Sequence, residues 1–341
     1  MKKILLSFRL LASVCDASTL AKVLEIKAEV DAIKQVLTEK NIPFTNLSDI
    51  ANSLDSNLPV YSGGDGTASD PFLVSTTSHF LAIGSGDVVG GASGSWDMDK
   101  HYKQVADIDF DGVVFTPVGH EFGTGYTAFT GSYDGNGYEI HNVSFTNTGS
   151  TFVGLFCRTE GATIKNIGLV NPNITGWNVV GGLIGTAESS TQVSKCYVVG
   201  GDVTATRTDT ATTAGGLVGY ARGGSTIEDC YARTSVSGVG AAGFVVLLAT
   251  GGSVENCWTA STVSGGSNNA FVTSGTAITN CYYNTDIFPT STSGTGLTTA
   301  DMYKQASYND WDFIDTWQIN EDASYPYFQA PYPVQSPAPA E

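Results

Sequence analysis

The stretch Ala214-Gly215-Gly216-Leu217-Val218-Gly219, followed closely by Ile227-Glu228-Asp229-Cys230-Tyr231, decides the fold of this 341-residue chain. Both motifs return along the sequence, and Cys230 has counterparts 34 residues earlier at Cys196 and 27 residues later at Cys257. A repeat of this length indicates one supersecondary unit stacked many times, because a single unit cannot bury its apolar edge alone. The apolar stretches within each unit are short and β-branched, which is typical of strands. We therefore expect one turn of a β-solenoid per repeat.

Two columns of residues follow from stacking the second motif. Its cysteine position holds Cys196, Cys230, Cys257 and Cys281, with Val143 and Ile167 in earlier copies. We expect these thiols to be buried and reduced, because side chains on adjacent turns stand about 4.8 Å apart, wider than a disulfide prefers. The preceding position holds Asn142, Asn166, Asn256 and Asn280, with Lys195 and Asp229 as replacements. Asparagine tolerates left-handed backbone, so this column predicts a bend whose amides bond the next turn.

The alternation of Gly-Gly-Leu-Val-Gly with Ile-x-Asn-Cys-Tyr resembles the GLUG repeats of bacterial surface and phage-associated β-helical proteins. Flanking segments at 66–74, 106–110, 317–320 and 324–328 are similar to those that accompany such repeats. The resemblance covers about residues 60–330 and implies extracellular adhesion and display. It brings no catalytic signature with it, and the first 57 residues lie outside it.

Charge and composition exclude several classes of function. With 33 acidic and 16 basic side chains the net charge is −17, which disfavours binding to nucleic acid or to anionic membranes. No stretch approaches the ~18 apolar residues that span a bilayer. The histidines and cysteines lack the spacing of metal ligands, so we expect no metal and no cofactor.

A heptad seam precedes the repeats. Its apolar positions recur at intervals of three and four residues: Val23, Ile26, Val30, Ile33 and Leu37. This pattern predicts a helix that joins copies of the chain, with β-branched residues favouring a homotrimer, or an amphipathic helix that packs on its own chain. The first fifteen residues also have features of a signal peptide.

An aromatic residue follows each cysteine: Tyr197, Tyr231, Trp258 and Tyr282. If the cysteine points inward, strand alternation turns this column outward. Aromatic faces suit stacking on sugar rings, so the column is a candidate glycan site. The alternative is that the rings stack on each other or pack against a neighbouring subunit.

Glu228 and Glu255 share a column on adjacent turns and are the candidate catalytic pair, since two carboxylates near ~5 Å form a retaining glycosidase site. Stacked glutamates that face solvent are the alternative reading, and we expect no enzyme activity.

The sequence thus predicts an all-β, right-handed parallel β-solenoid with a short N-terminal helical or coiled-coil segment. We expect the helical segment at 1–57, an N-terminal β cap and first turns at 58–150, GLUG-type repeats at 151–285, a C-terminal cap at 286–330 and a Pro-rich tail at 331–341. The first functional hypothesis is a virion fibre or decoration protein that is attached through its N-terminal segment and binds host-surface or mucosal glycans. The alternatives are a secreted or cell-surface bacterial adhesin and a glycan depolymerase.

Overall fold

The computed structural model describes residues 63–89, 94–119, 121–122, 125–208, 213–249, 251–266, 268–275 and 277–329. The chain divides into two compact units, Met1–Val60 and Tyr61–Glu341, and only the second is described below. The predicted helical segment at 1–57, its heptad positions Val23, Ile26, Val30, Ile33 and Leu37, and the tail at 331–341 lie outside the described residues.

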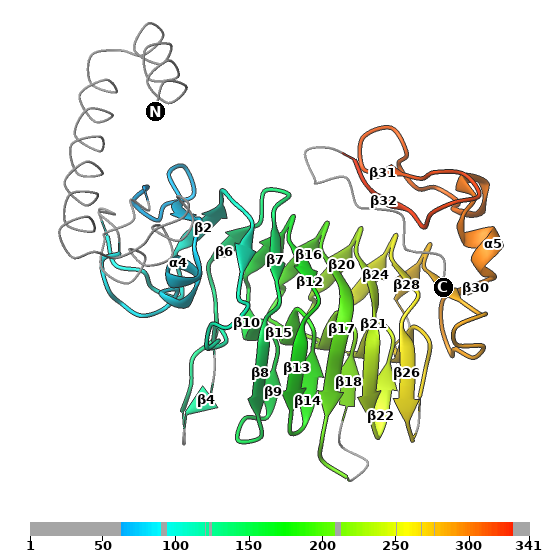
Figure 1. The fold of residues 1–341 in the computed structure, drawn as a ribbon, viewed down its shortest axis with the longest axis horizontal. Helices are drawn as coiled ribbons and strands as arrows, with labels where there is room; N and C mark the ends of the chain where they lie inside the picture. Colours follow the sequence, from blue (N-terminus) through cyan, green and yellow to red (C-terminus); the bar gives the residue numbers. More distant parts are fainter. Residues whose placement is uncertain are drawn as a thin grey trace, which may run out of the picture. The chain divides into compact units, whose positions relative to one another are not determined.

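The described chain winds as a parallel β-solenoid, which confirms the predicted fold (Figure 1). An eight-stranded sheet runs along it, with one strand from each turn. Its strands are, in order, β1 (Phe72–Val74), β2 (His101–Gln104), β6 (Ser132–Asp134), β11 (Thr163–Lys165), β16 (Gln192–Ser194), β20 (Thr226–Glu228), β24 (Ser253–Glu255) and β28 (Ile278–Thr279).

An eleven-stranded sheet forms the second side of the solenoid. Its main path is β3 (Ile108–Asp109), β7 (Glu139–His141), β12 (Gly168–Val170), β17 (Tyr197–Ala205), β21 (Tyr231–Gly238), β25 (Trp258–Thr259), β29 (Tyr282–Asn284) and β30 (Thr295–Leu297). Three further strands extend it beside β17 and β21: β8 (Ser144–Asn147), β13 (Asn173–Gly176) and β26 (Thr262–Gly265). This sheet carries the predicted aromatic column.

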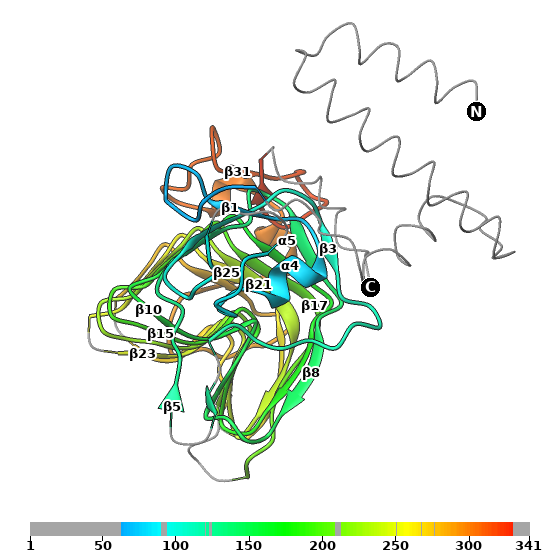
Figure 2. The ribbon, with the colours of Figure 1, turned by 90° about the vertical axis from the view of Figure 1, so that its left-hand side faces the viewer.

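Two smaller sheets complete each turn. The four-stranded sheet contains β9 (Phe152–Val153), β14 (Val179–Gly181), β18 (Thr213–Gly215) and β22 (Gly240–Ala242). The five-stranded sheet contains β10 (Phe156–Glu160), β15 (Ile184–Glu188), β19 (Val218–Ala221), β23 (Val245–Leu248) and β27 (Val272–Ser274). Figure 2 looks along the stack and shows the strands of successive turns overlying one another. A short antiparallel hairpin, β4 (Glu121–Phe122) with β5 (Gly125–Tyr126), interrupts the first turns.

The Gly-Gly motif marks the corner between these two smaller sheets. A Cβ on Gly182 would lie 2.5 Å from the carbonyl oxygen of Gly216, on the next turn. A Cβ on Gly216 would in turn meet the carbonyl of Gly243. Successive turns therefore approach so closely at this corner that only glycine fits, which is the physical reason for the repeated Gly-Gly.

The Asn column lies at the bend between the eight-stranded and eleven-stranded sheets, as predicted. Its φ angles lie between 49° and 56° at Asn166, Lys195, Asp229, Asn256 and Asn280. The assignment of Asn142 and Val143 to this repeat is wrong, because strand pairing aligns Gly168 with Glu139 and leaves Asn142 and Val143 between β7 and β8, within the eleven-stranded sheet. The amide Nδ2 of Asn166 donates to Asp134 Oδ1 on the previous turn at 2.9 Å, and that of Asn280 donates to Asn256 Oδ1 at 3.3 Å. The left-handed bend and the bonds between turns are therefore confirmed.

One continuous hydrophobic core fills the solenoid. At its N-terminal end the short helix α4 (Thr77–Leu81), capped by Thr76, inserts Phe80 among Phe110, Tyr133 and Phe156. Phe80 is fully buried there, so the aromatic cluster closes this end of the core.

Beyond β30 the described chain adds no further strand to the long parallel sheets. After β30 the chain forms α5 (Thr299–Met302), a 3₁₀ turn at Gln305–Ser307 and an antiparallel hairpin of β31 (Trp317–Gln318) with β32 (Tyr327–Phe328). Its aromatic residues form a second hydrophobic cluster with the aromatic column of the eleven-stranded sheet. The segment therefore runs back along the side of the solenoid instead of closing only its end (Figure 1).

Candidate functional site

The predicted aromatic column exists, and its rings stack on one another. The ring centroids of Tyr197 and Tyr231 are 4.9 Å apart, those of Tyr231 and Trp258 are 4.8 Å apart, and the interplanar angles are 4° and 5°. Strand pairing places Tyr282 opposite Trp258 on the next turn. The alternative in which the rings stack on each other is thus confirmed.

The same rings are buried beneath the C-terminal segment. Trp317 and Phe328 cover Tyr231, with ring centroids 6.2 and 5.4 Å away, and Tyr325 stacks on Trp258 at 4.8 Å. Tyr197, Tyr231, Trp258 and Tyr282 are each at most 4% exposed. The prediction that this column is an open sugar-stacking stripe is therefore wrong, because its faces are used to hold the chain's own C-terminal segment.

Polar contacts attach that segment to the bend column. Trp317 Nε1 donates to Asp229 Oδ1 at 3.2 Å, Trp311 Nε1 donates to the carbonyl of Asn280 at 2.9 Å, and Lys195 Nζ donates to Thr316 Oγ1 at 3.2 Å. Lys195 and Asp229 are the two replacements in the Asn column. They stand where the C-terminal segment docks, so the departure from asparagine has a structural reason.

Docking also changes the titration of Asp229. Burial raises the pKa of Asp229 to about 6, and the neighbouring Glu228 charge acts in the same direction. The hydrogen bond from Trp317 and the charge of Lys195 act in the opposite direction. The carboxyl beneath the C-terminal segment therefore titrates above the usual range of aspartate.

At the N-terminal end of the column, Tyr197 leans across a position that has no side chain. A Cβ on Gly168 would collide with the ring carbon Cζ and with Oη of Tyr197. Across this gap Tyr197 donates a hydrogen bond to Glu139 Oε1, and Glu139 Oε2 lies 3.1 Å from His141 Nε2. Gly168 therefore lets the column reach a polar group two turns away.

The candidate catalytic carboxylates lie on a different face. Glu228 and Glu255 are paired in register on β20 and β24 of the eight-stranded sheet, and both side chains are exposed. They stand on an open outer face, which is the solvent-facing arrangement that the sequence left as the alternative.

The cysteine ladder is buried and free of disulfides, as predicted for Cys196, Cys230, Cys257 and Cys281. The backbone N–H of Cys196 donates to Cys230 Sγ at 3.4 Å, and that of Cys230 donates to Cys257 Sγ at 3.3 Å. Burial raises the pKa of the Cys196 and Cys257 thiols well above the ordinary value. All four thiols of the ladder lie in the core and are at most 3% exposed, which places them out of reach of reagents in solution.

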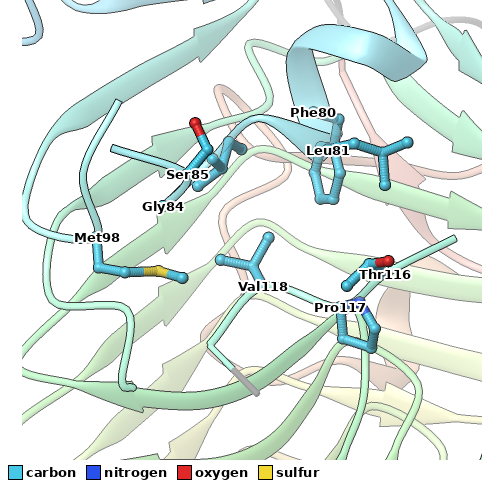
Figure 3. Close-up of a pocket in the computed structure, with 9 residues that line it drawn as sticks. Phe80, Leu81, Gly84, Ser85, Met98, Thr116, Pro117 and Val118 are labelled. Carbon is cyan, nitrogen blue, oxygen red and sulfur yellow. The ribbon is translucent and has the colours of Figure 1, made fainter. Parts of the chain in front are cut away.

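A small cavity of about 110 Å³ lies at the N-terminal end of the core (Figure 3). Phe80, Leu81, Met98, Pro117 and Val118 supply most of its lining. Within the described ranges, no three His, Cys, Asp or Glu side chains gather as a metal site would require. In the same ranges no helix has the length and apolar character to cross a bilayer.

Sequence reasoning missed one exposed aromatic residue. Trp177 follows β13 and is 41% exposed, the one aromatic among the exposed large apolar residues of the described chain. The guanidinium of Arg207, from the next turn, lies 4.7 Å from the centre of its ring. The alternation of Asn173, Thr175 and Trp177 was the available signal, since every second residue of a strand faces outward.

Comparison with known proteins agrees with this geometry. Residues 210–237 match the model of the GLUG motif. The match spans the corner glycines Gly215 and Gly216 and the first five-residue motif quoted above, Ile227–Tyr231, which the structure places at the corner and at the bend. The chain therefore carries a GLUG motif on a β-helical fold, as the sequence resemblance implied.

Two relatives are similar over part of the chain. Halomucin of Haloquadratum walsbyi is 33% identical over 175 residues, which is 48% of this chain and 2% of halomucin. A protein of Evansella cellulosilytica named as a Gly-rich membrane protein is 29% identical over 119 residues, or 34% of this chain and 13% of that protein. This chain thus spans only a small fraction of the relatives that it matches.

One solved structure shares the fold. A Bacteroides ovatus protein described as an immunoglobulin A1 protease aligns with a TM-score of 0.51 and 18% identity, covering 79% of this chain and 95% of that one. At this identity the likeness extends to the β-solenoid fold and not to an activity.

Proposed function

We propose that this chain is a non-enzymatic attachment module of a surface protein, in which the solenoid is a stiff scaffold that holds glycan-binding side chains. The observation that carries the proposal is the turn-by-turn pairing of the parallel strands, which continues on both sides of a bulge between Val199 and Asp202 of β17. Strand pairing runs turn by turn from β2 to β28, so each outer face repeats the same positions at the spacing of one turn. A surface of this kind suits a ligand that also repeats.

The placement of the candidate carboxylates supports the non-enzymatic part of the proposal. A retaining glycosidase needs one carboxyl with a raised pKa beside an ionised partner, around a bound sugar. Glu228 and Glu255 are instead exposed on an open sheet face. The likeness to a structure described as a protease is one of fold and does not oppose this.

The place of display is also part of the proposal. The name of the Evansella cellulosilytica relative puts that protein at a membrane, which favours a cell surface over a virion surface for this chain. The virion fibre remains the alternative within the same attachment function.

A binding assay combined with an activity assay tests the proposal. The whole chain is applied to a panel of immobilised neutral and acidic polysaccharides, and the release of reducing ends is measured in parallel. We expect retention on at least one polysaccharide with no release. Absence of binding across the panel would refute the attachment function, and release that is lost in Glu228→Gln or Glu255→Gln would identify a depolymerase.

A further inference from the structure

One outer face of the solenoid differs from the others in chemistry. The lower half of the eleven-stranded sheet is formed by β8, β13, β17, β21 and β26, which face the viewer in Figure 1. Its outward side chains form two columns in register. We call this surface the hydroxyl face; it consists of Ser144, Thr146, Asn173, Thr175, Asp202, Thr204, Ser235, Ser237, Thr262 and Ser264. The alternate residues, such as Ile174, Val203 and Val236, are buried in the core.

The eight-stranded sheet has a different chemistry, because one of its two outward columns is mostly charged. That column reads Lys103, Asp134, Lys165, Ser194, Glu228 and Glu255 over successive turns, beside a neutral column of His101, Ser132, Thr163, Gln192, Thr226 and Ser253. Lys165 and Asp134 even form an ion pair, with Nζ and Oδ2 3.4 Å apart. The eight-stranded sheet therefore carries a charged column beside a neutral one, whereas both columns of the hydroxyl face consist of short polar side chains, with Asp202 as their one charged member.

Short side chains make the hydroxyl face suited to binding. Ordering serine, threonine or asparagine costs less rotamer entropy than ordering lysine or glutamate. The hydroxyls are also linked across turns, since Ser237 Oγ donates to Thr204 Oγ1 at 3.1 Å. The face thus offers hydrogen-bond donors and acceptors at a regular spacing of about 4.8 Å with little loss of freedom on binding.

Trp177 lies at the rim of this face. It follows Gly176, the last residue of β13, and continues the outward parity of Asn173 and Thr175. Arg207 stacks on its ring, which holds the indole in place while leaving it 41% exposed. An exposed aromatic ring beside an array of hydroxyls is the combination that recognises sugar rings, because it binds their C–H faces and their hydroxyls together.

Charge narrows the class of ligand. Asp202 is the one charged residue of the hydroxyl face, and the guanidinium of Arg207 lies over Trp177 at its rim, within a chain of net charge −17. An acidic polymer would be repelled by the protein as a whole, and a cationic polymer would find a single carboxylate. We infer that the hydroxyl face with Trp177 is the attachment surface and that its ligand is a neutral, hydroxyl-rich polysaccharide. This inference rests on the proposed attachment function and names its site.

Matched variants of the whole chain test the inference on cellulose, chitin and xylan as neutral probes and on alginate as the acidic probe. Ser235→Lys with Thr262→Lys places two long charged side chains next to each other on β21 and β26 of the face, and we expect binding to the neutral polysaccharide to fall about tenfold or more. Thr226→Lys with Ser253→Lys makes the same kind of change on the same two turns of the eight-stranded sheet and should leave binding unchanged. Trp177→Ala should also weaken binding about tenfold, whereas Ile314→Ala, at another exposed apolar position, should not.

The outcomes separate the site from the function. Binding by the parent chain that neither Ser235→Lys with Thr262→Lys nor Trp177→Ala reduces would overturn the hydroxyl face and leave the attachment function standing. Binding to alginate alone would overturn the ligand class. Failure of the parent chain to bind any of the four polysaccharides would overturn both proposals. Circular dichroism melting of each variant shows that a loss of binding is not a loss of folding.

Discussion

Two residues of this solenoid depart from the type that is usual in their column, and each departure is explained by a side chain that packs on it. Asp229 occupies a column in which asparagine predominates, and it differs because Trp317 docks on it. Gly168 precedes the rings of Tyr197 to Tyr282 in its column, and it carries no side chain because Tyr197 crosses it to reach Glu139. In both cases the residue departs from its repeat where the chain makes a contact that the repeat does not specify.

The raised pKa of Asp229 makes docking of the C-terminal segment depend on pH. Because its folded pKa of about 6 exceeds the ordinary aspartate value of 3.8, this group favours the folded state below pH 3.8 and loses that contribution as pH rises through 6. Asp229→Asn does not titrate and keeps an oxygen that accepts from Trp317. We expect it to gain stability over the parent as pH rises from 4 to 8, on the order of 1 kcal/mol after allowance for partial solvent exposure. Urea unfolding of both proteins across this range measures the difference; a difference independent of pH would contradict the prediction.

Replacing Gly168 by alanine should dislodge Tyr197. The added Cβ would occupy the space of the Tyr197 ring, so the ring must leave its stack on Tyr231 or its bond to Glu139. We expect a loss of about 1–3 kcal/mol in the free energy of unfolding, the usual cost of overpacking. Gly149→Ala is the control, because a Cβ there would lie 3.7 Å from the Asn147 side chain, an ordinary contact. Equal stability of the two variants in chemical denaturation would be inconsistent with the crossing.

The described elements are of two kinds: strands that stack into the solenoid, and a C-terminal segment that packs on its side. The strands of each turn are held by hydrogen bonds to the turns on either side, as for β16 between β11 and β20. The segment from α5 to β32 is held on the side of the solenoid by aromatic contacts and a few hydrogen bonds. We therefore expect the docked segment to open before the turns separate.

Trp317→Ala should release this segment while the solenoid persists. Trp317 is fully buried, stacks on Trp311 with centroids 4.4 Å apart, and contacts Phe328 at 4.6 Å. Its truncation should cost about 3–5 kcal/mol locally, enough to expose residues 299–329 to proteases. Limited proteolysis with mass spectrometry should find cleavage confined to this segment, with the β signal in circular dichroism retained. Cooperative loss of the whole β signal would show that the segment and the solenoid unfold as one unit.

For the whole molecule, the residues that are predicted to set the oligomeric state lie outside the described residues. The heptad positions Val23, Ile26, Val30, Ile33 and Leu37 predict a homotrimer, and this remains a prediction.

Light scattering decides between the trimer and a helix that packs on its own chain. Ile26→Asp with Ile33→Asp places charge in the seam, which costs several kcal/mol, so we expect a mass near that of one chain. The solenoid should still fold, since each turn is stabilised by its neighbours. A parent protein that is already monomeric, or a variant with unchanged mass, would contradict the trimer.

The sequence by itself determined the features that depend on one turn and its neighbour. The Gly-Gly corner, the left-handed bend of the Asn column and the buried ladder from Cys196 to Cys281 recur on successive turns, so their spacing reveals stacked strands. Alternation also placed Tyr197, Tyr231, Trp258 and Tyr282 outside the main core.

Only the tertiary structure decided what covers each outer face. Trp317 lies 86 positions after Tyr231 and returns to cover it through a course that no local pattern encodes. The same structure leaves Trp177 and the hydroxyl face open, although their serines and threonines look like ordinary strand residues in the sequence. The physical reason is that covering a face depends on contacts between segments distant in the chain, whereas stacking depends on the repeat itself.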